Sequence, residues 1–140
     1  MIKTIISSLL IIFALQSCAS SEKDVCKPYG EVLFHEALSI KLDEIRFPYS
    51  KDERGLICVK EPKATELRNI VDQVHNYYRG LATILTTQNQ QDRVLSWVKE
   101  NNIPHSTQMS ENGIFIVIYS KTEKIAEDNK FKLDELLHSF

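Results

Sequence analysis

The cysteines are the residues of this 140-residue chain that most directly suggest chemistry. Cys18 belongs to the N-terminal segment, which leaves Cys26 and Cys58 as an even pair. In an oxidising compartment such a pair predicts a disulfide, and closing a loop of this length stabilises a fold by on the order of 3 kcal/mol. The alternative is a reactive or metal-binding thiol pair. That alternative lacks the C-x-x-C spacing and a histidine at ligand spacing.

A serine and a lysine one helical turn apart form the next candidate site. Ser96-Trp97-Val98-Lys99 matches the S-x-x-K motif of penicillin-binding enzymes, and Ser110-Glu111-Asn112 and Lys121-Thr122-Glu123 resemble their second and third elements. In that family the elements come from well-separated parts of a larger domain, and the third needs Gly where Glu123 stands. We therefore interpret the match as a helical serine and a solvated lysine beside a buried tryptophan.

The other polar residues form no recognisable site in the sequence. The adjacent acids Asp43-Glu44 and Asp134-Glu135 diverge on a regular element, so they do not form a catalytic dyad. No Gly-rich phosphate loop is present. The histidines are isolated, and none has the spacing of a zinc site: His35, His75, His105 and His138. The sequence therefore predicts a protein that is not an enzyme and that has neither a metal site nor a cofactor.

The N-terminal residues have the layout of a secretory signal peptide. Lys3 precedes the apolar run 5–15, which is shorter than the about 20 residues of a membrane-spanning helix. The segment Leu15-Gln16-Ser17-Cys18 resembles the lipobox of bacterial lipoproteins. This resemblance implies that residues 1–17 are removed as a signal peptide and that Cys18 becomes a diacylated N-terminus.

The residue after Cys18 bears on the location of the protein. In the lipoprotein family an Asp at this position retains a protein in the inner membrane, and Ala19 does not match it. The resemblance therefore implies a lipid-anchored protein of the outer membrane that faces the periplasm. The alternative is ordinary cleavage after Ala19, which would give a soluble periplasmic protein.

The rest of the chain divides into a tether and a domain. Residues 18–30 are polar and contain Pro28 and Gly30, so they predict a short lipid-anchored tether. Residues 31–140 are enough for a single globular domain and too few for two domains with separate cores.

The predicted elements of this domain follow from hydrophobic periodicity and turn signals. The segment 31–47 fits a helix or irregular start followed by a strand that ends at Pro48, and 49–59 fits a hairpin that places Cys58 in the core. The apolar series 62–85 predicts one amphipathic helix of about six turns, in which Gly80 marks close packing or a bend.

Thr87 and Gln90 form a capping-box pattern for a second helix that ends before Pro104. The turn 111–113 joins a strand at 105–110 to a central strand at 114–119, and apolar residues from Phe131 to Phe140 predict a terminal helix. This order predicts the α+β class, with a small, mostly antiparallel sheet and about three helices packed on one face. The other face, partly solvated, is a place where a partner can bind.

The functional hypotheses follow from these features. A formal net charge of −2 without a basic run gives no indication of nucleic-acid binding. A protein partner in the cell envelope is expected, with the membrane contacted through the N-terminal lipid. In size, export signal and lack of motifs the chain resembles immunity lipoproteins, which neutralise toxins that act in the periplasm.

Two alternatives remain open. The first is an accessory lipoprotein, such as a pilot or assembly subunit of a secretion or outer-membrane machine, which shares the same traits. The second is a carrier of a small apolar ligand, which would need an empty pocket lined by Tyr77, Tyr78 and Trp97.

Overall fold

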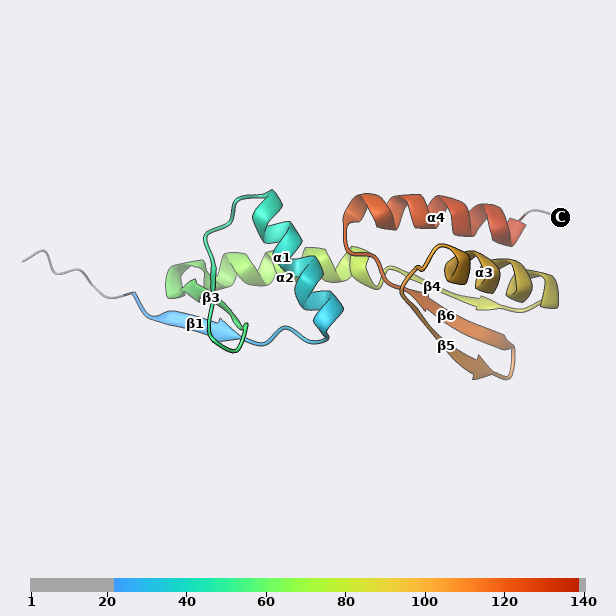
Figure 1. Cartoon of the computed structure of the whole chain (residues 1–140), viewed down its shortest axis with the longest axis horizontal. Helices are drawn as coiled ribbons and strands as arrows, with labels where there is room; N and C mark the ends of the chain where they lie inside the picture. Colours follow the sequence, from blue (N-terminus) through green and yellow to red (C-terminus); the bar gives the residue numbers. More distant parts are fainter. Residues whose placement is uncertain (1–21, 139–140) are drawn as a thin grey trace, which may run out of the picture.

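The computed structural model describes residues 22–138 (Figure 1). The predicted signal peptide, the predicted lipidation site Cys18 and the last two residues lie outside the described residues. Helices and antiparallel strands alternate along the described chain, which confirms the α+β class. The strands form two three-stranded antiparallel sheets, so the prediction of one small sheet with about three helices was too simple. Each sheet has its own hydrophobic cluster.

The first half of the molecule packs a sheet of order β1-β3-β2 against two helices. Its elements are β1 (Asp24–Lys27), α1 (Val32–Glu44), β2 (Ser50–Lys51), β3 (Ile57–Lys60), a short 3-10 turn (Glu61–Lys63) and α2 (Ala64–Tyr78). Strand β1 lies within 18–30, the segment for which the sequence predicts a tether, and it pairs with β3 over its whole length. Residues 24–27 of the predicted tether therefore belong to the first sheet.

The start of the segment 31–47 is a helix, α1, which continues to Glu44, and the strand predicted to end at Pro48 does not form. Phe34, Leu38 and Leu42 recur every four residues and are all buried, so one helical face reaches the core along its whole length. The helix ends at Glu44, and Arg46 adopts a positive φ of 54°. This turn redirects the chain, and only the two residues of β2 then pair with β3.

The predicted six-turn helix is also corrected, because α2 ends at Tyr78 and residues 81–85 form strand β4 (Leu81–Leu85). Leu81 and Leu85 are four residues apart, a spacing that keeps two side chains on one face in a helix and in a strand alike. The β-branched Thr83 and Ile84 favour the strand, and so does pairing with an apolar neighbour strand. Gly80 marks the boundary: a Cβ there would lie 2.5 Å from the carbonyl oxygen of Asn76.

The second half of the molecule has a sheet of order β4-β6-β5 with both of its helices on one side (Figure 1). The remaining elements are α3 (Gln88–Glu100), β5 (His105–Ser110), β6 (Gly113–Ile118) and α4 (Glu123–His138). The predicted capping box of Thr87 and Gln90 is confirmed, and β6 is the central strand as predicted. The prediction that Phe131 packs on the sheet is wrong, since 76% of this residue is exposed.

The two halves meet where α2 runs into β4 and where β6 leads into α4 (Figure 1). The N–H of Ser120 donates a hydrogen bond to the carbonyl of Tyr78 at 3.0 Å, and the rings of Tyr78 and Tyr119 are 5.4 Å apart. Two exposed ion pairs lie at the same junction: Glu36 of α1 with Lys121, and Glu31, the residue before α1, with Arg79.

Among residues 22–138, no helix combines the length and the apolar character that crossing a membrane would require.

Candidate functional site

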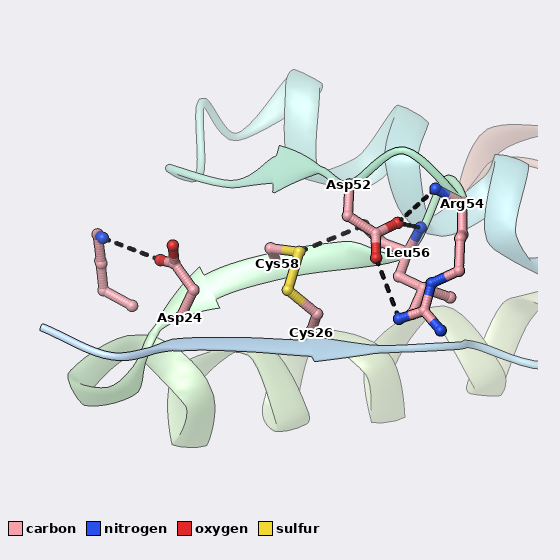
Figure 2. The surroundings of a disulfide bond; sticks show 7 residues. Asp24, Cys26, Asp52, Arg54, Leu56 and Cys58 are labelled. Carbon is pink, nitrogen blue, oxygen red and sulfur yellow. Dashed lines mark hydrogen bonds and ion pairs between the residues drawn. A yellow bond between two sulfur atoms is a disulfide. The ribbon is translucent and has the colours of Figure 1, made fainter.

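Cys26 and Cys58, the pair for which the sequence predicts a disulfide, are bonded in the structure with an S–S distance of 2.10 Å (Figure 2). They lie directly opposite each other on β1 and β3. Cys58 is buried, and Cys26 is on the exposed side of the edge strand. An ion pair between Asp24 and Lys60, 2.9 Å apart, lies at the end of the same strand pair. The bond fixes β1 to the core and leaves neither sulfur as a thiol.

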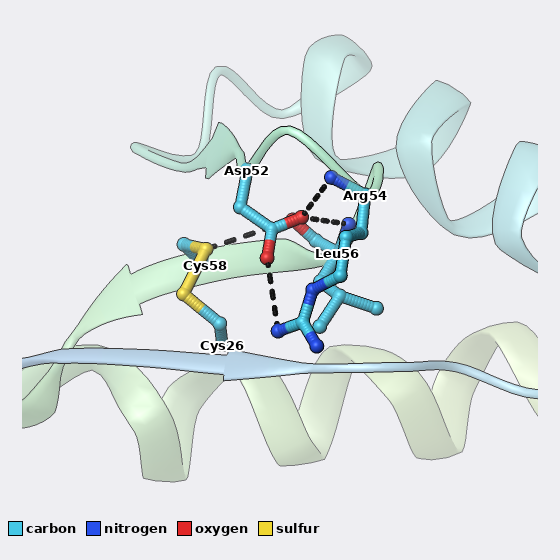
Figure 3. Close-up of polar contacts among 5 residues, drawn as sticks. All are labelled: Cys26, Asp52, Arg54, Leu56 and Cys58. Atoms are coloured by element: carbon cyan, nitrogen blue, oxygen red, sulfur yellow. Dashed lines mark hydrogen bonds and ion pairs between the residues drawn. A yellow bond between two sulfur atoms is a disulfide. The ribbon is translucent and has the colours of Figure 1, made fainter.

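The turn beside this disulfide is organised by Asp52 (Figure 3). Its carboxylate accepts hydrogen bonds from the N–H of Leu56 at 2.8 Å and the N–H of Arg54 at 2.9 Å, and the Arg54 side chain lies 3.4 Å away. The bond from Leu56 is the main cause that lowers the pKa of Asp52 below its usual value. All of these contacts close the loop between β2 and β3, so we assign Asp52 a structural role.

The residues that match the S-x-x-K pattern and its second and third elements lie on different parts of the fold. Ser96 and Lys99 are exposed on α3, and Trp97 between them is half-buried rather than buried as predicted. The hydroxyl of Ser110 donates to the carbonyl of Gly113 at 2.9 Å, and the ammonium of Lys121 pairs with Glu36 at 2.9 Å. The hydroxyl of Ser110 thus bonds within its own hairpin, and the ammonium of Lys121 bonds to a residue of α1.

The histidines within the described chain lie in separate surroundings, and His138 is the last residue of α4. The His75 ring stacks on Phe34 with centroids 4.2 Å apart, and Nδ1 of His105 is 2.8 Å from the carbonyl of Ile103. The half-buried His35 has no hydrogen-bond partner at Nε2. Within residues 22–138 there is no group of three or more His, Cys, Asp or Glu side chains that could hold a metal ion.

The aromatic residues considered for an apolar pocket do not share one. Tyr78 is buried in the first hydrophobic cluster, whereas Trp97 packs on the second. Tyr77 lines a groove of about 400 Å³ between α1, α2 and α4, which we call the junction groove. Burial, with the nearby Glu44 and Glu123, raises the pKa of Tyr77 to about 12. Charged side chains of both signs also line this groove: Lys41, Glu123, Glu127 and Lys130.

The uncovered face of the second sheet is the strongest candidate site. Because side chains alternate along a strand, those of β6 that face α3 and α4 are Ile114, Ile116 and Ile118, and those in between point the other way. Helices cover only the first of these faces (Figure 1). We define the open face by its four apolar residues: Ala82, Ile84, Phe115 and Val117.

The open face has an apolar centre and a polar side. Phe115 and Val117 are half-buried on the central strand, and Ile84 on the neighbouring edge strand is 40% exposed. On the other edge, β5 places Ser106 and Gln108 in register with Val117 and Phe115. The hydroxyl groups of Ser106 and Tyr119 are 3.0 Å apart. An apolar centre with a polar rim is the usual anatomy of a protein–protein interface.

The sequence contained part of the signal for this face. The run from Ile114 to Ile118 is apolar at every position, which indicates a strand with apolar side chains on both faces. Ala82 and Ile84 were missed because their segment was assigned to a helix. No family model, curated protein or solved structure matches this chain.

Proposed function

We propose that this chain is a non-catalytic, lipid-anchored protein of the bacterial cell envelope that binds another protein. Its most specific role in this proposal is that of an immunity protein, which neutralises a toxin that acts in the periplasm and comes from a rival or sibling cell. The observation that carries the proposal is the open face of the second sheet, with Ile84, Phe115 and Val117 at its centre.

This face supports protein binding for a physical reason. An antiparallel sheet that leaves one face in water normally alternates apolar and polar residues along each strand. Strand β6 instead carries Phe115 and Val117 outward as well as its three isoleucines inward. Burying such a surface against a partner gains about 25 cal/mol for each Å² of apolar area removed from water. Because the face is part of a sheet, binding would need little ordering of the backbone.

The position of β1 supports a domain that is held close to the membrane through its first half, with the open face in the half farther from β1 (Figure 1). Strand β1 begins at Asp24, and the disulfide at Cys26 fixes this strand to the core. A lipid on Cys18 would therefore be separated from the folded domain by a chain that spans at most about 20 Å when fully extended. A domain held at this distance meets proteins that arrive at the periplasmic surface of the outer membrane.

The test is a competition between sibling cells with and without the gene. We expect cells that lack the gene to be killed by parental cells, and the wild-type gene to restore their survival. The variant Ile84→Glu places a charge beside Phe115 on the open face and is expected not to restore survival. Phe131→Glu is the matched control, because Phe131 is 76% exposed on α4 and lies outside the open face.

Both variants must reach the membrane fraction at the wild-type level, which an immunoblot would show. Equal protection by Ile84→Glu and Phe131→Glu would contradict the assignment of the open face. Survival of cells that lack the gene, together with mislocalisation of a secretion or outer-membrane component, would contradict the immunity role and favour the accessory lipoprotein.

A further inference from the structure

Strand β5 is a free edge of the second sheet. The order β4-β6-β5 places β5 at one side, and no strand in residues 22–138 pairs with its other side (Figure 1). Five of its six residues are exposed, from Ser106 to Ser110. An unpaired edge offers a row of backbone N–H and C=O groups to any further strand.

The register identifies which backbone groups are free. The N–H of Tyr119 donates a hydrogen bond to the carbonyl of Pro104 at 2.8 Å. These two residues lie opposite each other when the β5–β6 register is continued by one residue beyond His105 and Ile118, so they form a hydrogen-bonded pair. Hydrogen-bonded and non-hydrogen-bonded pairs alternate in an antiparallel ladder. His105, Thr107 and Met109 are therefore the residues whose backbone groups point away from β6.

The edge lacks the features that usually prevent strands from pairing. Natural edges carry charged residues or proline, and the edges of the first sheet have Asp24 and Lys27 on β1 and Lys51 on β2. Strand β5 reads HSTQMS, with no Asp, Glu, Lys, Arg or Pro. Nothing in its side chains therefore repels a second strand of the same sequence.

We propose that two copies of this chain pair through β5, antiparallel, about a two-fold axis at Thr107. In this register Thr107 of one copy faces Thr107 of the other, His105 faces Met109, and Ser106 faces Gln108. Each of the three outward residues then exchanges backbone hydrogen bonds with the second copy. Threonine pairs are favourable neighbours across strands, and no like charges face each other within the strand. Met109, now 75% exposed, gains a neighbour.

The other uncharged edge is less suited to this pairing. Since β4 and β5 bond to opposite sides of β6, the outward backbone groups of β4 belong to Ala82 and Ile84 only. Directly after this strand, the N–H of Thr86 donates to the Gln90 side chain, and the chain enters α3. Strand β5 thus offers the longer ladder. Symmetric pairing through one edge also closes at two copies, whereas pairing β4 with β5 would extend without end.

The pairing has a consequence for the open face. A two-fold axis perpendicular to the sheet keeps the helices of both copies on one side and both open faces on the other. The dimer would thus present a doubled apolar surface over one continuous sheet. The pairing is inferred from β5 alone and does not depend on the proposed function.

Cysteine cross-linking on the full, membrane-extracted chain tests the register. In the Thr107→Cys variant the two new cysteines, one from each copy, face each other across the two-fold axis, where paired Cα atoms are about 5.5 Å apart. Ser110→Cys is the matched control on the same strand, and the same register separates its two copies by about 20 Å along the strand. We expect mild oxidation to give a disulfide-linked dimer with Thr107→Cys, and no more dimer with Ser110→Cys than with the wild-type chain. Equal cross-linking by both variants would overturn the proposal.

The size of the protein gives the second test. Analytical ultracentrifugation of the wild-type chain in detergent should detect a dimer at about 100 µM or below. Thr107→Pro removes an N–H that faces solvent in the monomer, so it should leave the circular dichroism spectrum unchanged and weaken dimerisation by about tenfold or more. A wild-type chain that stays monomeric contradicts the proposal. A Thr107→Cys cross-link to a different envelope protein only, and not to a second copy, also contradicts the proposal, because the edge would then bind that protein.

Discussion

Removal of the Cys26–Cys58 disulfide is expected to lower the free energy of unfolding by about 3.7 kcal/mol at 25 °C. The bond joins residues 32 positions apart, and the chain-entropy relation gives this value for a closed loop of that length. Cys26 is exposed and Cys58 is buried, so the double variant Cys26→Ala/Cys58→Ala leaves no unpaired thiol and removes little apolar contact beyond the bond itself. Most of the loss should therefore come from the freedom gained by the unfolded chain.

The assay is urea unfolding followed by far-UV circular dichroism and by the fluorescence of Trp97, the single tryptophan of the chain. Trp97 packs on the second hydrophobic cluster, so coincident transitions would also show that both halves unfold together. Dithiothreitol should destabilise the wild-type protein to the level of the double variant and should not affect the variant. A loss below about 1 kcal/mol, or a reductant effect on the variant, would refute the reasoning.

Three further outcomes are expected. Gly80→Ala should destabilise the protein by about 1–3 kcal/mol in thermal unfolding, because its Cβ would meet the carbonyl of Asn76; an unchanged melting temperature would contradict this close approach. Tyr77, with a pKa of about 12, should ionise later than an ordinary tyrosine in ultraviolet titration. Since only the unfolded state then releases this proton between pH 10 and 12, stability should fall as the pH rises through that window; a flat stability profile there would contradict it. Cys18→Ser should move the protein from the membrane fraction to the soluble periplasm, and a variant that stays in the membrane would refute lipidation.

The elements with strong local signals could be predicted from the sequence. The Thr87 and Gln90 pattern gave the start of α3, and the turn around Asn112 gave the hairpin of β5 and β6. These signals depend on caps and turns within a few residues, so tertiary contacts do not override them.

The errors arose where two structures satisfy the same spacing. Leu81 and Leu85 fit a helix and a strand equally, and only pairing with β6, distant in sequence, distinguishes the two. The division of the strands into two sheets likewise depends on which strands pair, which periodicity does not encode. As a consequence Ile84, a member of the open face, could not be placed from the sequence, whereas Phe115 and Val117 could be placed on a strand but not on a particular face.

Photo-cross-linking from the open face, in living cells, is the most direct test of the central claim that this face binds a protein partner. A photoreactive amino acid would replace Ile84, and the same amino acid at the exposed Phe131 would serve as the control. We expect irradiation to link the chain to one defined envelope or incoming protein from position 84 and not from position 131. Cross-linking from position 131 alone, or from neither position in cells that contain the proposed toxin, would contradict the claim.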